Sequence, residues 1–221
     1  MSNDIRTKAI VLRRTKYGET DRILNLLTPE GQFSVLAKGV RKEKSRLAGG
    51  IEMFCVSDVV IHQGRGDLGM LTSAKMLTFY QNLLTDFSSL ELASQILKQV
   101  NKVSNQVDSP ELFSLVEQCF SGLHKGLNHQ LVEAWFLFNL ARIGGEEANL
   151  HLDTAGQKLS QDIRYVWDSI ERALAPQEQG NITADHIKFM RLLHVAELAV
   201  AARVKNHDVF LDDILYIARS I

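Results

Sequence analysis

The sequence predicts an α+β protein in which a small five-stranded β-barrel is followed by an all-α helical domain. Near residue 80 the hydrophobic pattern changes from short alternating segments to helical spacing. The charge changes at the same place: residues 1–80 carry 13 Lys and Arg against 8 Asp and Glu, and the remainder carries 12 against 18. The net charge of −1 for the whole chain therefore conceals a basic first part and an acidic second part.

Five short segments rich in β-branched and aliphatic residues predict the strands of the barrel. They are separated by turn sequences such as Pro29-Glu30-Gly31, where proline restricts φ and glycine allows a positive φ. A second turn is predicted at Gly64-Arg65-Gly66-Asp67. The predicted strands are residues 9–14, 22–28, 33–38, 51–62 and 68–77.

Helical spacing and helix-end signals predict the second part of the chain. Ser109-Pro110-Glu111 has the order of an N-cap, a first-turn proline and an early acid. Gly144-Gly145 can end a helix in the left-handed conformation. The predicted helices are residues 90–100, 111–119, 130–143, 158–173, 184–204 and 209–217. The expected domains are residues 1–80 and 81–221.

Cysteine content and the start of the chain favour a reducing cytoplasm. Only Cys55 and Cys119 are present, which excludes a disulfide framework and a CxxC zinc site, and we expect two buried thiols. Residues 1–4 lack a secretory pattern, and no segment is apolar enough to span a membrane.

A basic segment at residues 38–46 predicts nucleic-acid binding. Clustered cations favour phosphate backbones, and a five-stranded barrel with a basic face is typical of the OB-fold. A solvated loop is the alternative interpretation. The segment contains Lys38, Arg41, Lys42, Lys44 and Arg46, and further cations on the first two strands are Arg6, Lys8, Arg13, Arg14, Lys16 and Arg22. Glycines 39, 49 and 50 would let a ligand approach the backbone.

Aromatic residues of the barrel divide into core and surface candidates. Phe33 and Phe54 lie in apolar alternation and are expected in the core. Tyr17 lies beside Gly18 in a polar turn, where it could stack on a base.

Enzymatic signatures are missing from the sequence. No phosphate-binding loop, dinucleotide-binding turn, HExxH helix or nucleophile elbow occurs. His124, His129, His151 and Asp153 could be imagined as a metal cluster, but they lack fixed ligand spacing, so surface or capping roles are expected. A metal-dependent hydrolase stays a minor alternative, and we expect no cofactor.

The helical part offers a candidate site for a partner peptide. Trp135 belongs to an aromatic stripe whose default role is core packing. Lys188 and Arg191 are one turn apart on an otherwise apolar helix, where they could flank a groove for an acidic peptide with a terminal aromatic residue.

Motifs in the first 54 residues resemble RecO, the bacterial recombination mediator family. The matching segments are TKAIVLR at 7–13, YGETDRI at 17–23, LTPEG at 27–31, LAKGVRK at 36–42 and SRLAGGIEMF at 45–54. Beyond Tyr80 the resemblance rests on helical architecture and on Gly144 closing the aromatic helix.

The resemblance implies an activity in DNA repair without covalent chemistry. Such a protein binds single- and double-stranded DNA, anneals complementary strands and helps RecA load onto DNA coated by single-stranded DNA-binding protein. The implied partners are DNA, RecR and the acidic C-terminal tail of the single-stranded DNA-binding protein, with RecA involved indirectly and no membrane. By motif position, Lys38, Arg41, Lys42, Lys44 and Arg46 would contact phosphates.

Two departures from the family pattern change what the resemblance implies. Many members carry a four-cysteine zinc module after the aromatic helix, but residues 144–165 contain no cysteine, so we predict no zinc. Basic residues expected before the aromatic helix are also missing, and Lys188 and Arg191 are the substitute prediction for the tail site. The main alternative is a protein-interaction adaptor whose OB-fold binds nucleic acid only incidentally.

Overall fold

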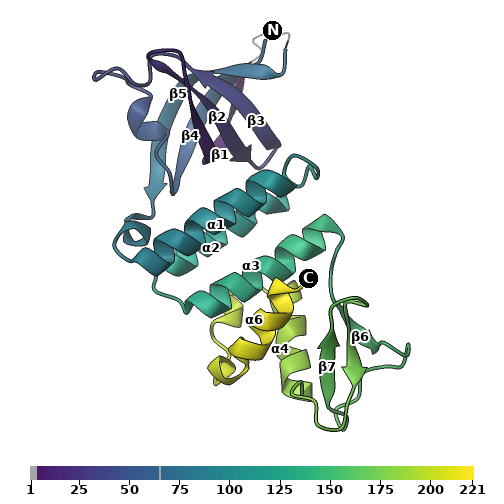
Figure 1. Cartoon of the computed structure of the whole chain (residues 1–221). Helices are drawn as coiled ribbons and strands as arrows, with labels where there is room; N and C mark the ends of the chain where they lie inside the picture. The colour runs from purple at the N-terminus through teal and green to yellow at the C-terminus, as the bar shows by residue number, and fades with distance from the viewer. Residues whose placement is uncertain (1–3, 65) are drawn as a thin grey trace. The chain divides into compact units, whose positions relative to one another are not determined.

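The computed structural model describes residues 4–64 and 66–221, so residues 1–3 and Arg65 of the predicted 64–67 turn lie outside the described part. The chain forms two compact units, Met1–His124 and Lys125–Ile221, and each is described by itself (Figure 1). The predicted boundary at residue 80 coincides with the end of the barrel. The first compact unit extends further, because it also contains the next two helices.

The first unit contains a closed barrel with the strand order β1-β2-β3-β5-β4. All neighbouring strands are antiparallel except β3 and β5, which are parallel. The strands are β1 (Asp4–Tyr17), β2 (Asp21–Thr28), β3 (Gly31–Ala37), β4 (Cys55–His62) and β5 (Leu68–Phe79). The predicted fold class and barrel are confirmed.

Alternating apolar residues from every strand fill the barrel. Val11, Leu24 and Val35 are examples of this core, all of them buried. The fourth strand begins later than predicted, because a 3-10 turn, η1 (Ala48–Gly50), precedes it. Gly50 lies against the backbone of Ala74 in β5, where an added Cβ would stand 2.4 Å from the carbonyl carbon. The absence of a side chain at Gly50 therefore lets the 3-10 turn pack against β5.

Two helices complete the first unit. They are α1 (Phe87–Val103), which follows the short η2 (Gln81–Leu84), and α2 (Glu111–His124). The carboxylate of Asp86 caps α1 by accepting from the Ser89 N–H at 2.8 Å. Phe120 of α2 makes edge contacts with Phe54 and Tyr80, each with ring centroids 5.7 Å apart. Phe54 is buried, as predicted.

The second unit is built around α3 (His129–Gly144), whose aromatic stripe is buried as predicted. Asn128 caps its start, and Gly145 ends it with φ +75°. The other helical elements are α4 (Ala184–Val195), α5 (Leu198–Ala201), η3 (His207–Phe210) and α6 (Leu211–Arg219). The single helix predicted over residues 184–204 is wrong, since Ala196 has extended backbone angles and separates α4 from α5.

A three-stranded sheet replaces the helix predicted over residues 158–173, so that prediction is wrong. The sheet has the order β6-β8-β7, formed by β6 (Asn149–Asp153), β7 (Tyr165–Asp168) and β8 (Ala173–Pro176). Buried Asp153 fixes the turn after β6 by accepting from the N–H groups of Ala155 and Gln157. Fully buried Tyr165 anchors β7, and its hydroxyl accepts from the Ser160 N–H at 2.9 Å.

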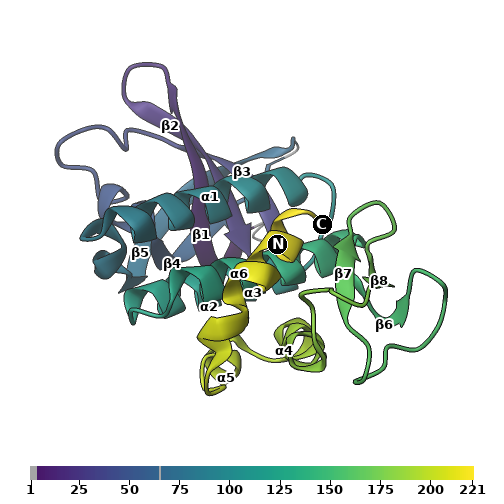
Figure 2. The same ribbon diagram turned by 60° about the horizontal axis from the view of Figure 1, so that its bottom comes forward.

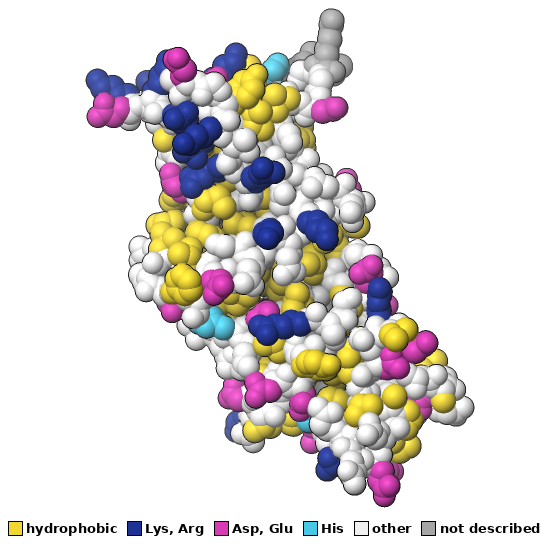
Figure 3. All heavy atoms as spheres, viewed as in Figure 1, with side chains coloured by type: hydrophobic (Ala, Val, Ile, Leu, Met, Phe, Trp, Pro, Cys, Tyr) yellow, Lys and Arg dark blue, Asp and Glu magenta, His cyan; other side chains and the backbone are white. Residues whose placement is uncertain are grey.

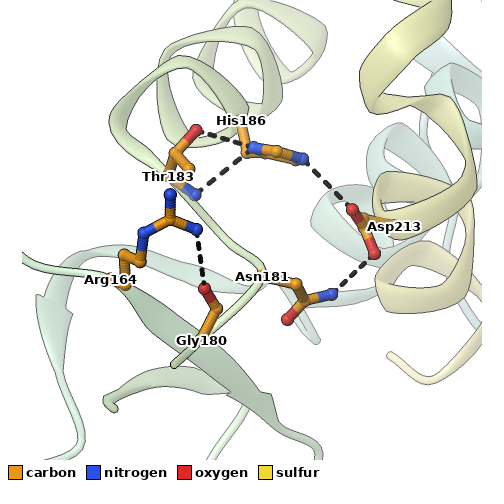
Figure 4. Close-up of polar contacts among 6 residues, drawn as sticks. All are labelled: Arg164, Gly180, Asn181, Thr183, His186 and Asp213. Carbon is orange, nitrogen blue, oxygen red and sulfur yellow. Dashed lines mark hydrogen bonds and ion pairs between the residues drawn. The ribbon is translucent and has the colours of Figure 1, made fainter. Parts of the chain in front are cut away.

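A polar chain joins the start of α4 to α6 (Figure 4). Nδ1 of His186 lies 2.9 Å from the Thr183 hydroxyl, and its Nε2 lies 3.3 Å from a carboxylate oxygen of Asp213. This hydroxyl–imidazole–carboxylate order resembles a hydrolase triad. However, His186 Nδ1 also accepts from the Thr183 backbone N–H at 3.3 Å, which completes a capping box for α4. The arrangement is therefore a structural brace.

Candidate nucleic-acid interface

The β1–β2 hairpin extends beyond the part of β1 that pairs with β4 (Figure 2). Side chains directly opposite each other in an antiparallel ladder lie on the same face, and successive residues alternate between faces. Arg14 pairs with Leu24, and Lys16 pairs with Arg22. These residues share the face of Leu24, which lines the barrel core. The core face of the barrel thus becomes a basic face toward the hairpin tip.

Lys16 and Arg22 are like charges placed directly opposite each other. Such pairs are destabilising in a sheet unless something else compensates for them. Among the residues that the structure describes, neither side chain has an acid within ion-pair distance. A polyanion seated at the hairpin would remove this repulsion.

Arg13 and Tyr17 lie on the other face of the hairpin. Arg13 is opposite Asn25, whose side-chain amide donates to Asn101 of α1 at 3.0 Å. Tyr17 ends β1 and is 53% exposed, so its ring is open to a stacking partner. The cations and the aromatic residue predicted at this hairpin therefore occupy both of its faces.

The loop between β3 and η1, residues 38–47, is held against the hairpin turn by Asp21. One carboxylate oxygen of Asp21 accepts from the Gly39 N–H at 2.7 Å and from the Thr20 hydroxyl at 3.0 Å. The carbonyl of Thr20 in turn accepts from the Arg41 N–H at 2.8 Å. Gly39 has φ +62°, a conformation that favours glycine. Four hydrogen-bonded residues thus connect the two basic segments.

The pKa of Asp21 is lowered, first by the hydrogen bond from Gly39, then by that from Thr20, with smaller contributions from Lys38 and Lys42. The carboxylate therefore stays ionised at neutral pH and remains an acceptor for the loop. Sequence reasoning treated Asp21 only as part of a motif and missed this role. A signal for it was available, since an Asp in a turn favours bonds to nearby backbone N–H groups.

Eight cations gather on the hairpin and the loop, and we call them the basic surface. They are Arg13, Lys16, Arg22, Lys38, Arg41, Lys42, Lys44 and Arg46. All are exposed except Arg22, which is half-buried. Within residues 4–64 and 66–221, none of the eight forms an ion pair. Figure 3 shows Lys and Arg side chains gathered over the barrel.

Two cations suggested by the sequence are neutralised by ion pairs with acids of the first unit. Arg6 forms a two-bond pair with Asp58, with Nη2 2.6 Å from a carboxylate oxygen, and this pair lowers the pKa of Asp58. Arg14 pairs with Glu52 at 3.0 Å. Arg14 thus lies on the same face of the hairpin as Lys16 and Arg22, but Glu52 already neutralises its charge.

The residues predicted for a partner peptide lie in the second unit and differ in accessibility. Trp135 is only 3% exposed, and its Nε1 donates to the Ala196 carbonyl at 2.9 Å. Lys188 is exposed and pairs with Asp185 at 3.0 Å. Arg191 donates twice to the Leu150 carbonyl, at 2.8 and 2.7 Å. Lys188 and Arg191 line one hollow of about 330 Å³, and Trp135 lies buried at the end of α4.

The histidines considered as metal ligands have separate roles. His124 ends α2 against the ring of Tyr80, whose hydroxyl pKa burial raises to about 12. His151 lies on β6. In the described part of the chain, no group of three His, Cys, Asp or Glu side chains could hold a metal ion. Both cysteines are buried, and burial raises their thiol pKa values.

No helix among residues 4–64 and 66–221 has the length and apolar character needed to cross a bilayer.

Comparison with known proteins shows which proteins the chain is similar to. Residues 1–80 match the family model described as recombination protein O N terminal. The chain is 27% identical over 225 residues to DNA repair protein RecO of Dehalococcoides mccartyi strain CBDB1, covering 96% of this chain and 87% of that protein. DNA repair protein RecO of Syntrophomonas wolfei is 26% identical over 208 residues, covering 91% and 83% respectively.

A shorter match has higher identity. DNA repair protein RecO of Heliobacterium modesticaldum is 38% identical over 112 residues, which cover 50% of this chain and 41% of that protein. The first two matches extend through both compact units, and the model match covers the barrel that carries the basic surface. The chain is therefore similar over most of its length to proteins named DNA repair protein RecO, and its barrel matches the recombination protein O N-terminal model.

Proposed function

We propose that this chain acts in DNA repair and recombination as a non-enzymatic mediator that binds single- and double-stranded DNA and anneals complementary strands. The observation that carries the proposal is the basic surface: eight cations without acidic partners among the described residues, on two segments joined through Asp21. The names of the relatives, DNA repair protein RecO, support the same role.

Phosphate neutralisation explains how such a surface would act. Each phosphate contacted by Lys or Arg releases condensed counterions, so binding is favoured without reading the base sequence. Arg22 and Lys16 on one hairpin face and Arg13 on the other give separate places for phosphates. Two strands held on one cationic surface repel each other less, which favours pairing of complementary bases. Tyr17 would stack on a base at the hairpin tip.

The proposed mediator role includes the partners RecR, RecA and single-stranded DNA-binding protein. By annealing and by contacting the coating protein, the chain would assist the loading of RecA onto coated DNA. RecA would then be affected indirectly, through the exposed DNA. Location in the cytoplasm, associated with the nucleoid, belongs to the same proposal.

A salt titration of DNA affinity tests the proposed surface. Replacing Lys38, Arg41 and Lys42 with Ala should weaken binding to all sequences. It should also reduce the slope of log affinity against log salt by about 2 for a single strand, or about 0.7 for each lost contact. Fluorescence anisotropy with a short labelled strand measures both quantities. Arg6→Ala is a matched control, since Arg6 is already paired with Asp58, and it should leave the slope unchanged.

Unchanged affinity and slope in the triple variant would contradict the assignment of the loop. Absence of salt-sensitive binding by the wild-type chain would favour an adaptor whose barrel contacts a protein.

The acidic tail of the single-stranded DNA-binding protein is proposed to bind at the hollow containing Lys188 and Arg191. An apolar terminal residue of the tail would contact the side chains of Ile187 and Leu159 there. Trp135 would act indirectly, by holding the end of α4 through its hydrogen bond to the Ala196 carbonyl. A carboxylate of the tail would compete with exposed Asp185 for Lys188. Lys188→Glu should weaken binding of a labelled tail peptide severalfold, whereas Lys205→Glu, also exposed in this unit, should not. Equal binding by Lys188→Glu and wild type would reject this site.

A further inference from the structure

A polar hollow of about 430 Å³ lies in the first unit, between strands β3 and β5 of the barrel and the end of α1. Its lining residues are distinct from the eight cations of the basic surface. Its volume falls in the range of small-molecule sites. The lining residues are Gln32, Ser34, Asp67, Leu68, Ser104 and Asn105.

Two hydrogen bonds hold the end of α1 against the outer face of the barrel. The side-chain amide of Asn25 on β2 donates to the Asn101 side chain at 3.0 Å, as described above. The Ser104 hydroxyl donates to Oε1 of Gln32 on β3 at 2.6 Å. Because the Gln32 oxygen accepts this bond, its Nε2 is the end that can donate to a ligand. The helix and β3 thus form a fixed boundary of the hollow.

The other polar groups of the hollow include both donors and acceptors. The Ser34 hydroxyl can do either, and the Asp67 carboxylate accepts. Asn105 presents its side-chain oxygen, because its amide nitrogen donates to the Asn101 carbonyl at 2.7 Å. Leu68, which is 45% exposed, adds an apolar surface. Nucleic-acid bases combine a hydrogen-bonding edge with an apolar face, so the hollow fits an unpaired base.

Two lysines of α1 stand beside the hollow. Lys98, Lys102 and Asn105 recur at intervals of four and three, and the C-cap Ser104 keeps helical angles, so the three lie on one side of the helix. Both lysines are exposed, and neither has an acid within ion-pair distance among the described residues. In Figure 3, Lys or Arg side chains lie over the region where Figure 1 places α1. Like charges at this spacing disfavour a helix, and a phosphate between them would remove the repulsion.

Arg13 places a cation of the basic surface on the face that leads to the hollow. It is opposite Asn25, and Asn25 is opposite Ser34, so the three side chains lie on one face across β1, β2 and β3. Neighbouring strands are about 4.8 Å apart, which separates Arg13 from Ser34 by roughly 10 Å. A DNA strand that crosses from the hairpin to α1 would therefore pass over the hollow.

Asp67 is unexpected beside a polyanion, because its carboxylate repels phosphates. It is exposed, and it forms no ion pair within residues 4–64 and 66–221. A carboxylate is, however, a good acceptor for the exocyclic amino group of cytosine, whereas thymine presents an oxygen at the corresponding position. Asp67 therefore gives the hollow a preference for a base that carries an amino group.

We propose that this hollow binds one unpaired, amino-bearing base of a DNA strand whose phosphates contact Arg13, Lys98 and Lys102. This role of the hollow rests on the proposed function and extends it, because the basic surface binds without reading the sequence and the hollow adds a modest preference at one nucleotide. A base whose hydrogen-bonding edge contacts the protein cannot be paired at the same time. The site therefore favours a single strand over a duplex.

Labelled oligo-dC and oligo-dT of equal length separate base recognition from phosphate binding. The full chain should bind oligo-dC about fivefold more tightly in fluorescence anisotropy, the order expected for one specific base contact. Asp67→Asn should bring the two affinities together, because its amide can donate to thymine as well as accept from cytosine. Glu91→Gln is the matched control, since it removes the same charge from an exposed acid of α1 outside the hollow and should leave the preference unchanged.

The salt dependence of binding tests the two lysines. Replacing Lys98 and Lys102 together with Ala should reduce the slope of log affinity against log salt by about 1.4 for either strand, or about 0.7 for each lost contact. Lys75→Ala removes an exposed cation of β5 outside the hollow, and it should leave the slope unchanged.

Equal affinity of the wild-type chain for the two oligonucleotides would overturn the proposal, as would a preference that survives Asp67→Asn. An unchanged salt slope in the double lysine variant would overturn the path along α1. In each of these cases salt-sensitive binding by the basic surface would persist, so the proposed function would stand. Absence of salt-sensitive binding to either oligonucleotide would instead reject both.

Discussion

Asp21 gives a sharp test of how the basic surface is organised, because it is an acid that we expect to strengthen binding to a polyanion. Its carboxylate accepts from the Gly39 N–H and the Thr20 hydroxyl, and thereby fixes the start of the loop that carries five of the eight cations. Asp21→Ala removes both the negative charge and the acceptor. Asp21→Asn removes the charge but retains an oxygen that can accept from Gly39.

Two effects of Asp21→Ala oppose each other. Loss of one negative charge at the surface reduces repulsion of the phosphates and so favours DNA binding by a small factor. Loss of the acceptor leaves the loop unattached at Gly39. The apparent affinity for DNA is then the affinity of the ordered loop multiplied by the fraction of molecules in which the loop is still in place. The net contribution of one such hydrogen bond typically changes an equilibrium constant by about tenfold, and exposure to solvent reduces that factor. We therefore expect Asp21→Ala to bind DNA roughly threefold to tenfold more weakly than Asp21→Asn.

Glu43→Ala is the matched control, because Glu43 is an exposed acid of the same loop. Fluorescence anisotropy at fixed salt should give tighter binding for Glu43→Ala and for Asp21→Asn than for wild type, and weaker binding for Asp21→Ala. Thermal unfolding should confirm that all three variants are folded. If Asp21→Ala binds DNA as tightly as Glu43→Ala, charge alone governs affinity and the loop attachment has no role.

Two further predictions concern the second unit. Gly180→Ala should lower the free energy of unfolding by about 1–3 kcal/mol, since a Cβ there would stand 2.3 Å from the Tyr165 carbonyl oxygen. Calorimetry measures this loss. Gly144→Ala is the control and should show no such loss, because a Cβ there would meet nothing within 4 Å. Because burial lowers the pKa of His194, the unfolded chain takes up its proton first, so stability should fall as the pH drops below about 6.5. Urea unfolding at several pH values should show a weaker pH dependence for His194→Gln, and an unchanged dependence would contradict this role.

The barrel could be predicted from sequence because its signals are local. Pro29 and Gly31 mark a tight turn, and alternation places Leu24, Val35 and their neighbours in one core. The same reasoning located the helix that ends at Gly145. The cations of the basic surface were also visible as a cluster in residues 38–46.

The small sheet was missed because its sequence imitates a helix. Leu159, Ile163, Val166 and Ile170 recur at intervals of three and four, yet Ile163 and Ile170 are exposed. The residue that organises this region is Tyr165, which lies outside that pattern and is fully buried. Its position depends on Gly180, fifteen residues away, which approaches its backbone closely. Such non-local packing overrides helical spacing and leaves no local signal.

Ion pairing was equally hidden in the sequence. Arg6 and Arg14 count as cations like any other, but their partners Asp58 and Glu52 are 52 and 38 residues away. Only the strand register brings each pair together. The sequence therefore overestimated the contribution of these two arginines to the surface that faces a ligand.

Charge counts cannot rank substitutions on this surface, because its acids have different roles. Asp21 holds the loop, Glu52 neutralises Arg14, and Glu43 has neither contact. Each contributes the same −1 to the total. Removing Glu52 would release a cation on the core-derived face of the hairpin, whereas removing the Asp21 side chain would release the segment that carries most of the cations. The relevant quantity for a polyanion is the number of unpaired cations that the fold holds in fixed positions, and acids can raise that number as well as lower it.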